Sequence, residues 1–537
     1  MKSRALFVAA VALLAAVCFT VALRGADFFE DDLYNTGTIL RSAAAKTGPL
    51  LQTSIAAAYY AQYPVVRAED WHRSLSMLIA SASVRLTGSS TVIGVLHCGY
   101  LATFGTLMFL LIRRAASDGP SPVDAERTGL RANWIALATI AAVIASPYGL
   151  LILSRTATDD IPSGCLVLAG LWLVLRSEFP TARAAAAAGV FFGAAFWAKD
   201  LCLLWTGLGS LILLVGLLRG RPRLTIGRLV IAALPGLCAA VVAGGKLLWN
   251  HADLGTFLPS LALTENRIFI FGRFTGFDPH FPYYLRGDAR LDSAVALAGG
   301  VLPAIKAVIA LQLPGLHALA DEFAPVLPLL IAALLIPRQF TAERPFLGRL
   351  GRAVVTILAV YLVFCLTGAS TVDQPRYWIV PVGLACGLGL IFLLDVWRRM
   401  AFTVPRLRAL AGAVVYAVSV YQFPSAYFGL RKAPLIPPSV VAWVQEALAK
   451  GSPEDTVALN GRRAFYYYGL TGDRVVTIWP AALNALTPDD ERRWLSDYHV
   501  RWAVLQDSDT ATRVALERIG FTVAHQDAGY LMLQPAR

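Results

Sequence analysis

The amino-acid sequence predicts a mainly α-helical protein that crosses a membrane about eleven times and ends in a small soluble α/β domain. Three observations predict this fold class. Apolar residues make up 57% of the 537 residues and charged residues only 15%, whereas soluble domains carry about 25% charged residues. Long apolar runs recur from the N-terminus to about residue 425, with short charged clusters between them. From about residue 431, short strand-like and helix-like segments replace these runs.

The net charge of +12 fits a polytopic topology better than nucleic-acid binding. The basic residues lie in short clusters between apolar runs, as the positive-inside rule expects. All seven cysteines lie inside apolar runs and none forms a CxxC, so neither a disulfide framework nor a zinc site follows. The sequence has no P-loop, Rossmann or GxSxG motif, so ATP-driven transport, nicotinamide chemistry and serine hydrolysis have no support.

The first apolar run, roughly residues 5–23, is interpreted as a retained span and not as a cleaved signal peptide. Lys2 and Arg4 precede it, its apolar core is long, and no small-x-small cleavage site follows. With its basic end inside, this span delivers Glu30-Asp31-Asp32 to the outer face of the membrane.

The first outer loop, residues 33–90, is expected to carry amphipathic helices on the membrane surface. Between residues 33 and 44, apolar or small residues recur at the spacing of a helix that lies flat on a bilayer. The apolar stretch 74–86 is short for a span, and we interpret it as a second candidate surface helix.

The later spans follow from apolar length and from the alternating sign of the flanking charges. Counting one pass at a time places every basic cluster inside and every acidic cluster outside. The stretch 292–312, within a second outer loop, stays open between a surface helix and a span. The expected spans after the first are 91–112, 132–153, 162–176, 185–198, 201–218, 229–248, 323–337, 353–369, 378–396 and 409–423.

The chain divides into a membrane module, residues 1–430, and an extracytoplasmic α/β domain, residues 431–537. A proline-rich linker around residue 437 separates the two parts. Strand-like and helix-like runs then alternate, which is typical of a small α/β domain. The expected strands are 456–460, 475–478, 502–506 and 530–534, and the expected helices include 440–450 and 510–519.

Two carboxylate pairs, Asp31/Asp32 and Asp159/Asp160, are predicted at the same outer face, each just beyond the end of a span. Such a pair suits a general base that acts on a hydroxyl or amine, and it equally suits a divalent cation held against a phosphate. The alternative is that Asp32 and Asp160 only cap helices, since ionisable groups at membrane edges are often simply solvated.

A set of basic residues on the same face is a candidate for binding a phosphate or diphosphate, because arginine offers a bidentate fork to phosphate oxygens. Headgroup contact or snorkelling explains any one of them equally well, and Lys199 beside Asp200 suits a simple ion pair. His280, which precedes a tyrosine pair, shows no metal-ligand spacing. The set consists of Lys199, Arg267, Arg273 and Arg376.

These motifs resemble those of the C-type (GT-C) polytopic glycosyltransferases, in the branch that holds the protein O-mannosyltransferases and the lipid A aminoarabinose transferases. Asp31-Asp32-Leu33-Tyr34 is similar to the acidic pair and tyrosine of that family's first outer loop, and Asp160-Ile161-Pro162 to its second acidic motif. Gly193–Lys199 looks like the Gly-x-x-x-x-x-Lys of the fifth span, and Arg376-Tyr377 like a late Arg-Tyr. One departure is His72-Arg73-Ser74-Leu75, where many relatives have Pro-Pro-Leu.

The resemblance implies transfer of a hexose or pentose from a polyprenyl-phosphate donor, such as undecaprenyl phosphate, to a lipid, glycan or protein acceptor. The transfer would take place outside the cytoplasm, in the inner membrane of a bacterium, and would invert the sugar carbon. Asp31 would be the base, with Asp32 beside it and Asp159 and Asp160 in support, and any divalent cation stays open. The residues implied to hold the lipid phosphate and substrates are Lys199, Arg267, Arg273, Arg376, Tyr377, Tyr34 and His280.

Three other functions stay open. A lipid or glycolipid transporter predicts ionisable residues at mid-membrane and paired repeats, whereas here the charges cluster at the edges and no repeat is visible. A ligase or polymerase that moves preassembled glycan would use similar chemistry, which the sequence barely separates from sugar transfer. A non-catalytic scaffold would make both acidic pairs dispensable.

Overall fold

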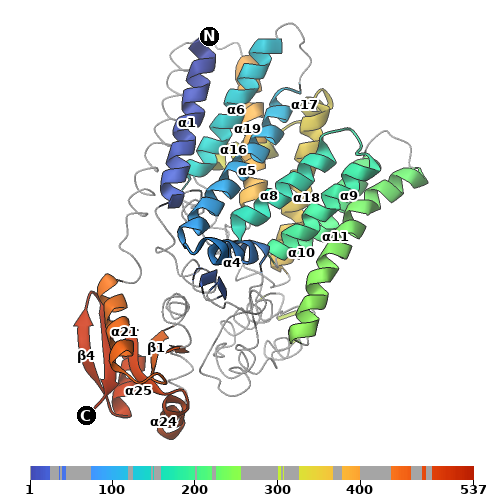
Figure 1. Ribbon diagram of the computed structural model, residues 1–537. Coiled ribbons are helices and arrows are strands. Elements are labelled where there is room, and N and C mark those ends of the chain that lie inside the picture. Colours follow the sequence, from blue (N-terminus) through green and yellow to red (C-terminus); the bar gives the residue numbers. More distant parts are fainter. Residues whose placement is uncertain are drawn as a thin grey trace.

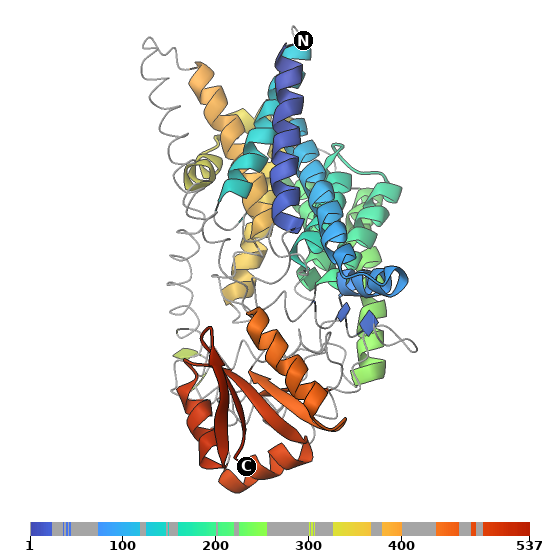
Figure 2. The same ribbon diagram turned by 60° about the vertical axis from the view of Figure 1, so that its left-hand side comes forward.

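The structure, a computed structural model, consists of a helical bundle and a small domain built on a mixed β-sheet (Figure 1). In both views the N-terminus lies at one end of the bundle and the sheet domain lies beyond the other end (Figures 1 and 2). The structure describes residues 2–23, 74–118, 125–146, 159–199, 202–219, 225–254, 326–366, 378–399, 437–460, 474–478 and 487–536, with a few isolated positions between them.

The bundle forms from the apolar runs, because a segment inside a bilayer has to satisfy its backbone hydrogen bonds internally and therefore becomes helical. One shorter helix, α4 (Leu75–Thr87), lies across the bundle towards the end that is away from the N-terminus (Figure 1). The bundle helices are α1 (Lys2–Leu23), α5 (Thr91–Ala116), α6 (Ala125–Ala145), α8 (Asp160–Leu175), α9 (Ala182–Ala198), α10 (Leu203–Arg219), α11 (Ile226–Leu254), α16 (Leu327–Leu334), α17 (Arg338–Ala342), α18 (Pro345–Leu366) and α19 (Ile379–Arg399).

The described helices confirm a polytopic α-helical membrane protein. Four of them, α5, α11, α18 and α19, are long and apolar enough to cross a bilayer by length and composition. Further apolar helices of 10–17 residues include parts of α1, α6, α8, α9 and α10. The predicted count of about eleven spans stays a prediction, because the expected span 409–423 and nearly all of the stretch 292–312 lie outside the described residues.

One expected span is divided into two short helices in the structure. Residues 323–337 were expected to form a single helix, but α16 covers only Leu327–Leu334 and a second short helix, α17, starts at Arg338. Pro337 stands at the boundary, with an extended ψ of 151°. Proline disfavours helical geometry in the residue before it and has no N–H to donate, so the first helix ends before it.

The helices α8, α9, α10 and α11 pack side by side, with α11 at the edge of the bundle (Figure 1). Glycine on α9 permits this close packing, because a Cβ built on Gly193 would lie 2.6 Å from the Cβ of Val242 on α11. Phe192 and Trp205 stack between α9 and α10 with ring centroids 5.9 Å apart, and the Trp205 indole donates to the Tyr361 hydroxyl over 3.1 Å. These contacts pack α9 against α10, and α10 against α18.

The C-terminal domain contains a five-stranded sheet in the order β2-β1-β3-β5-β4. Strand β1 pairs in parallel with β2 and β3, while β5 runs antiparallel to both β3 and β4. Helix α21 packs its apolar face, including Val440 and Val444, against Val457 and Val504 of the sheet. The elements are α21 (Pro438–Lys450), β1 (Thr456–Asn460), β2 (Val475–Ile478), α24 (Pro488–Asp497), β3 (Val500–Gln506), α25 (Thr510–Arg518), β4 (Phe521–Asp527) and β5 (Tyr530–Pro535).

The sequence predicted β1, β2, β5 and α25 to within a residue, and β3 except for its first two residues. It missed α24 and β4. Strand β4 is an edge strand in which most side chains are exposed, so it lacks the apolar alternation that identifies a half-buried strand. A tight turn at Ala528 and Gly529, both with positive φ, joins it to β5.

Candidate functional site

Three of the predicted site residues lie within the described part of the chain: Asp159, Asp160 and Lys199. They come together where α8 begins and α9 ends. The other candidates lie outside the described residues, and their roles stay predictions. These are Asp31, Asp32, Tyr34, Arg267, Arg273, His280, Arg376 and Tyr377.

Asp160 and Lys199 form an ion pair between Oδ1 and Nζ. The Asp160 side chain is 1% exposed and that of Lys199 is 16% exposed, so the lysine is the more accessible member of the pair. Asp160 stands in the first turn of α8 and Lys199 directly follows the last turn of α9. Each charge therefore lies at the helix end whose dipole favours it. The sequence suggested an ion pair of Lys199 with Asp200, which lies outside the described residues; the structure pairs Lys199 with Asp160.

Asp159 has different partners, although it is adjacent in sequence. Its Oδ1 accepts hydrogen bonds from the hydroxyls of Ser74, at 2.6 Å, and Ser76. Burial raises the pKa of the Asp159 carboxyl to about 6, although the two hydroxyls and the charge of Lys199 act in the opposite direction. The pair Asp159/Asp160 thus consists of one carboxylate that serines hold and one that a lysine holds.

The helix-capping alternative for Asp160 is wrong. Asp160 is the first residue of α8, inside the helix, and Asp159 occupies the N-cap position. Asp159 makes no side-chain capping hydrogen bond there, because its carboxylate turns to the serines of α4. Asp159 therefore does not cap α8 through its side chain, and Asp160 contributes a negative charge to the first turn of the helix.

Ser74 explains what stands in place of the Pro-Pro-Leu of many relatives. It is the N-cap of α4: its Oγ accepts from the Met77 amide over 3.1 Å and donates to Asp159. The stretch 74–86 is helical, as α4, and an apolar cluster packs against its inner face; its place on the membrane surface stays a prediction. That cluster joins α4 to the start of α5 and to the expected amphipathic segment, where positions 36, 39 and 43 are helical and buried. Its buried members are Ile39, Ala43, Met77, Ala80, Val84 and Ile93.

Sequence analysis missed Lys246, which it counted only as part of the apolar span 229–248. Lys246 lies in α11 and is 2% exposed. Its ammonium donates to the carbonyl oxygens of Phe196 and Trp197 at the end of α9, directly before Lys199. A signal was present, because a lysine deep inside an apolar run is costly and is by default a functional candidate.

The described residues give no metal site: among them, no group of three or more His, Cys, Asp or Glu side chains is arranged to hold an ion. The Asp159 and Asp160 carboxylates already accept from serine hydroxyls and an ammonium. A divalent cation therefore stays a prediction, since the first acidic pair, Asp31/Asp32, lies outside the described residues.

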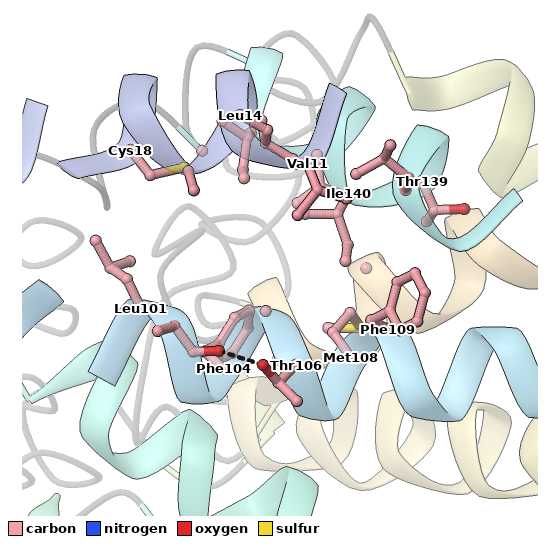
Figure 3. A pocket seen from close by; sticks show the side chains of 18 of the residues that line it. Val11, Leu14, Cys18, Leu101, Phe104, Thr106, Met108, Phe109, Thr139 and Ile140 are labelled. Carbon is pink, nitrogen blue, oxygen red and sulfur yellow. Dashed lines mark hydrogen bonds between the residues drawn. The ribbon is translucent and has the colours of Figure 1, made fainter. Parts of the chain in front are cut away.

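A cavity of about 420 Å³ lies beside this site, between α1, α5, α6 and α19. Figure 3 shows Val11, Leu14 and Cys18 of α1 facing Leu101 and Met108 of α5 across it. Its lining is almost entirely apolar. Lining residues extend along α1 from residue 7 to residue 19, a length of about 18 Å at 1.5 Å per residue.

One end of the cavity approaches the ion pair. Ile161, one of its lining residues, directly follows Asp160 at the start of α8. A residue that lines the cavity is therefore adjacent in sequence to the buried Asp160. The apolar cavity and the charged site thus meet at the start of α8.

Fold and site together define a polytopic membrane protein with an acidic–basic site at one end of its helical bundle. The chain is similar to the oligosaccharyltransferase of Archaeoglobus fulgidus, with 10% identity and a TM-score of 0.54 over 94% of this chain and 71% of that one. It is also similar to ArnT from Cupriavidus metallidurans, with 14% identity and a TM-score of 0.41 over 99% and 98%. No protein-family model and no curated protein matches the chain. The first likeness shows that the chain shares the fold of this oligosaccharyltransferase, in agreement with the family resemblance of the motifs.

Proposed function

We propose that the protein is a glycosyltransferase that moves a hexose or pentose from a polyprenyl-phosphate donor to a lipid, glycan or protein acceptor. The observation that carries the proposal is the Asp160–Lys199 ion pair, which lies where α8 begins and α9 ends. The fold that holds this pair is shared with an oligosaccharyltransferase. Sugar transfer from a lipid phosphate releases an anion at the membrane boundary. A preorganised cation in a site of low water content stabilises such a leaving group.

Lys199 is the residue that meets this requirement. Its side chain is 16% exposed while that of Asp160 is 1% exposed, so in this proposal the lysine is the member of the pair that an incoming phosphate reaches. Asp160 holds the ammonium in place through the ion pair. Because Asp160 is enclosed, it is poorly placed to take a proton from an acceptor. This favours Asp31, from the first outer loop, as the base.

In the proposed step, an acceptor oxygen or nitrogen attacks the anomeric carbon of the donor sugar and gives up its proton to Asp31. The bond from that carbon to the phosphate oxygen breaks, and the lipid phosphate leaves with the electron pair. Lys199 stabilises the negative charge that develops on this phosphate. One displacement inverts the sugar carbon, and it requires one base and one stabilised leaving group.

Asp159 receives a different role in this proposal from the catalytic one first expected. Its two serine partners fix the N-terminal end of α4 beside α8. The segment that leads into α4 is the first outer loop, which carries Asp31 and Asp32. Asp159 is thus a positioning residue that docks this loop at the site.

The apolar cavity supports a lipid substrate. We assign it to one hydrocarbon chain of the donor, because its walls are apolar and its length matches a chain that runs along the bundle. The chain would enter from the lipid and end near Ile161, which places its phosphate at the level of Asp160 and Lys199.

The proposed orientation puts the N-terminus in the cytoplasm and the site and C-terminal domain outside it, in a bacterial inner membrane. Arg113 and Arg114 end α5 at the end of the bundle that also holds the N-terminus. Asp118 accepts from the amides of Phe346 and Leu347, which brings the basic loop before α18 to the same end. Basic residues gathered at one end support a cytoplasmic location for it.

The test uses the full-length protein in lipid nanodiscs with polyprenyl-phosphate sugars that carry a labelled hexose or pentose. Envelope extract supplies the acceptor. We expect Lys199→Met to lower transfer by roughly 10²–10³-fold, the cost of one preorganised charge-stabilising group. Lys306→Met is the matched control, because Lys306 is an exposed lysine of the second outer loop. Absence of transfer by the unmodified protein with every donor, or full activity of Lys199→Met, contradicts the proposal.

A further inference from the structure

Lys246 makes three contacts with the last turn of α9. Its Nζ donates to the carbonyl oxygen of Phe196 over 2.9 Å and approaches that of Trp197 at 3.4 Å. The same ammonium lies 4.9 Å from the centroid of the Phe196 ring. A charge that is 2% exposed is thus compensated by backbone oxygens and an aromatic face.

The carbonyl groups that Lys246 contacts are among those that a helix leaves without an internal partner. The last four C=O groups of an α-helix have no amide donor from the helix itself. The Lys199 amide donates to Ala195 O over 2.9 Å, and α9 ends at Ala198. The ammonium therefore satisfies the next two oxygens and also lies at the negative end of the helix dipole.

Other contacts fix the same two helices at the same level. The Trp197 indole donates to Val242 O over 2.7 Å, one turn before Lys246 on α11. The rings of Trp197 and Trp249 stack with centroids 5.7 Å apart. Lys246 is the charged member of a clamp that these residues form between α9 and α11.

We infer that Lys246 is a positioning residue for Lys199: by holding the last turn of α9 it directs the Lys199 ammonium to Asp160 and to the phosphate of the donor. Lys199 directly follows this turn and has an extended backbone, with φ −151° and ψ 126°. The Cys202 amide donates to Lys199 O over 2.9 Å, so the chain turns there into α10. The effect of Lys246 on catalysis rests on the proposed glycosyl transfer. Its effect on the position of Lys199 does not.

Lys246 acts through Lys199 in this account, since its own ammonium is enclosed. A double-mutant cycle separates this from an independent contribution. We expect Lys246→Met to lower kcat on the order of 10²-fold, because a shift of about 1 Å in a catalytic group has that effect. In the Lys199→Met background the same change should lower kcat less than twofold. Lys246→Arg, which keeps the charge and the donors, should restore at least a tenth of the activity.

Hydrogen exchange supplies a readout that does not depend on activity. In full-length protein in nanodiscs, Lys246→Met should speed exchange of the Lys199 and Cys202 amides at least tenfold, and leave the amides of α18 unchanged. Trp197→Phe, which removes the indole donation to Val242 O and reduces the ring that stacks on Trp249, should act in the same direction more weakly and serves if Lys246→Met does not fold.

Unchanged exchange at Lys199 and Cys202 in these variants overturns the clamp. If the double variant loses kcat by the product of the two single-variant factors, Lys246 does not act through Lys199. A wild-type protein without transfer activity, combined with the expected change in exchange, removes the proposed function and keeps the positioning role.

Discussion

Ser76→Ala is the perturbation that best isolates the docking of α4 on Asp159. Ser76 lies in the first turn of α4 and donates its hydroxyl to Asp159 Oδ1, whereas Ser74 also caps the helix. Removal of Ser76 therefore takes away one hydrogen bond and leaves the N-cap intact. The second serine keeps Asp159 hydrogen bonded, so the carboxylate does not become isolated.

The size of the effect follows from two terms. A hydrogen bond to a charged group contributes about 1.5–3 kcal/mol. Alanine is a better helix former than serine by about 0.5 kcal/mol, which offsets part of the loss. The free energy of α4 docking should therefore fall by roughly 1–2.5 kcal/mol. Opening of α4 becomes about 5- to 70-fold more frequent, since 1.4 kcal/mol is a factor of ten.

Hydrogen exchange of the α4 amides, measured in nanodiscs, reports this opening directly. Ser81→Ala is the matched control, because Ser81 is a fully buried serine of the same helix whose hydroxyl has no partner within the described residues. Its removal should leave exchange equal or slower. Equal exchange in Ser76→Ala and Ser81→Ala would refute the docking role of Asp159.

Three other predictions concern charge. Asp160→Asn or Lys199→Met alone should destabilise the protein by about 3–5 kcal/mol, because each single change leaves a buried charge without its partner. The double variant should be destabilised by less than either single variant. Thermal unfolding of the four proteins in detergent measures this double-mutant cycle, and additive losses of stability would contradict the prediction. The pKa of Asp159 is raised to about 6, so between the unfolded and the folded pKa the native state holds a proton that the unfolded state has lost. The Tm difference between wild type and Asp159→Asn should therefore shrink as pH rises from 4 to 7. A Tm difference that does not change with pH would argue against the raised pKa. In the C-terminal domain, Arg518→Ala removes the 2.8 Å ion pair of Glu491, a fully buried carboxyl whose pKa burial already raises. Hydrogen exchange of the α24 amides should therefore rise more at pH 7 than at pH 5. A rise that does not depend on pH would count against the ion pair.

The sequence predicted the elements that a short window contains. The apolar runs that became α5, α11, α18 and α19 are long enough to be recognised one at a time. The position of Asp159/Asp160 at the start of a span was also predictable, because the change from apolar to acidic residues is local. Strand β4 was missed because its exposed edge position leaves no apolar periodicity.

The division of labour between the two aspartates was beyond reach. Asp159 and Asp160 have the same side chain, and their roles differ because Ser74 lies 85 positions away and Lys199 lies 39 positions away. Lys246 was missed for a related reason: one charge in an apolar window barely changes its hydropathy. Its meaning comes from the carbonyl groups at the end of another helix, which the fold brings to it.

Mass spectrometry of envelope glycans and lipids tests the central claim most directly, in cells that lack the protein and in cells that regain it as wild type, Asp31→Asn or Lys199→Met. The account predicts that one sugar modification disappears without the protein, that its polyprenyl-phosphate donor accumulates, and that wild type alone restores both to normal. Unaltered glycans and lipids in the cells without the protein, or full restoration by Asp31→Asn and Lys199→Met, would contradict glycosyl transfer at this site.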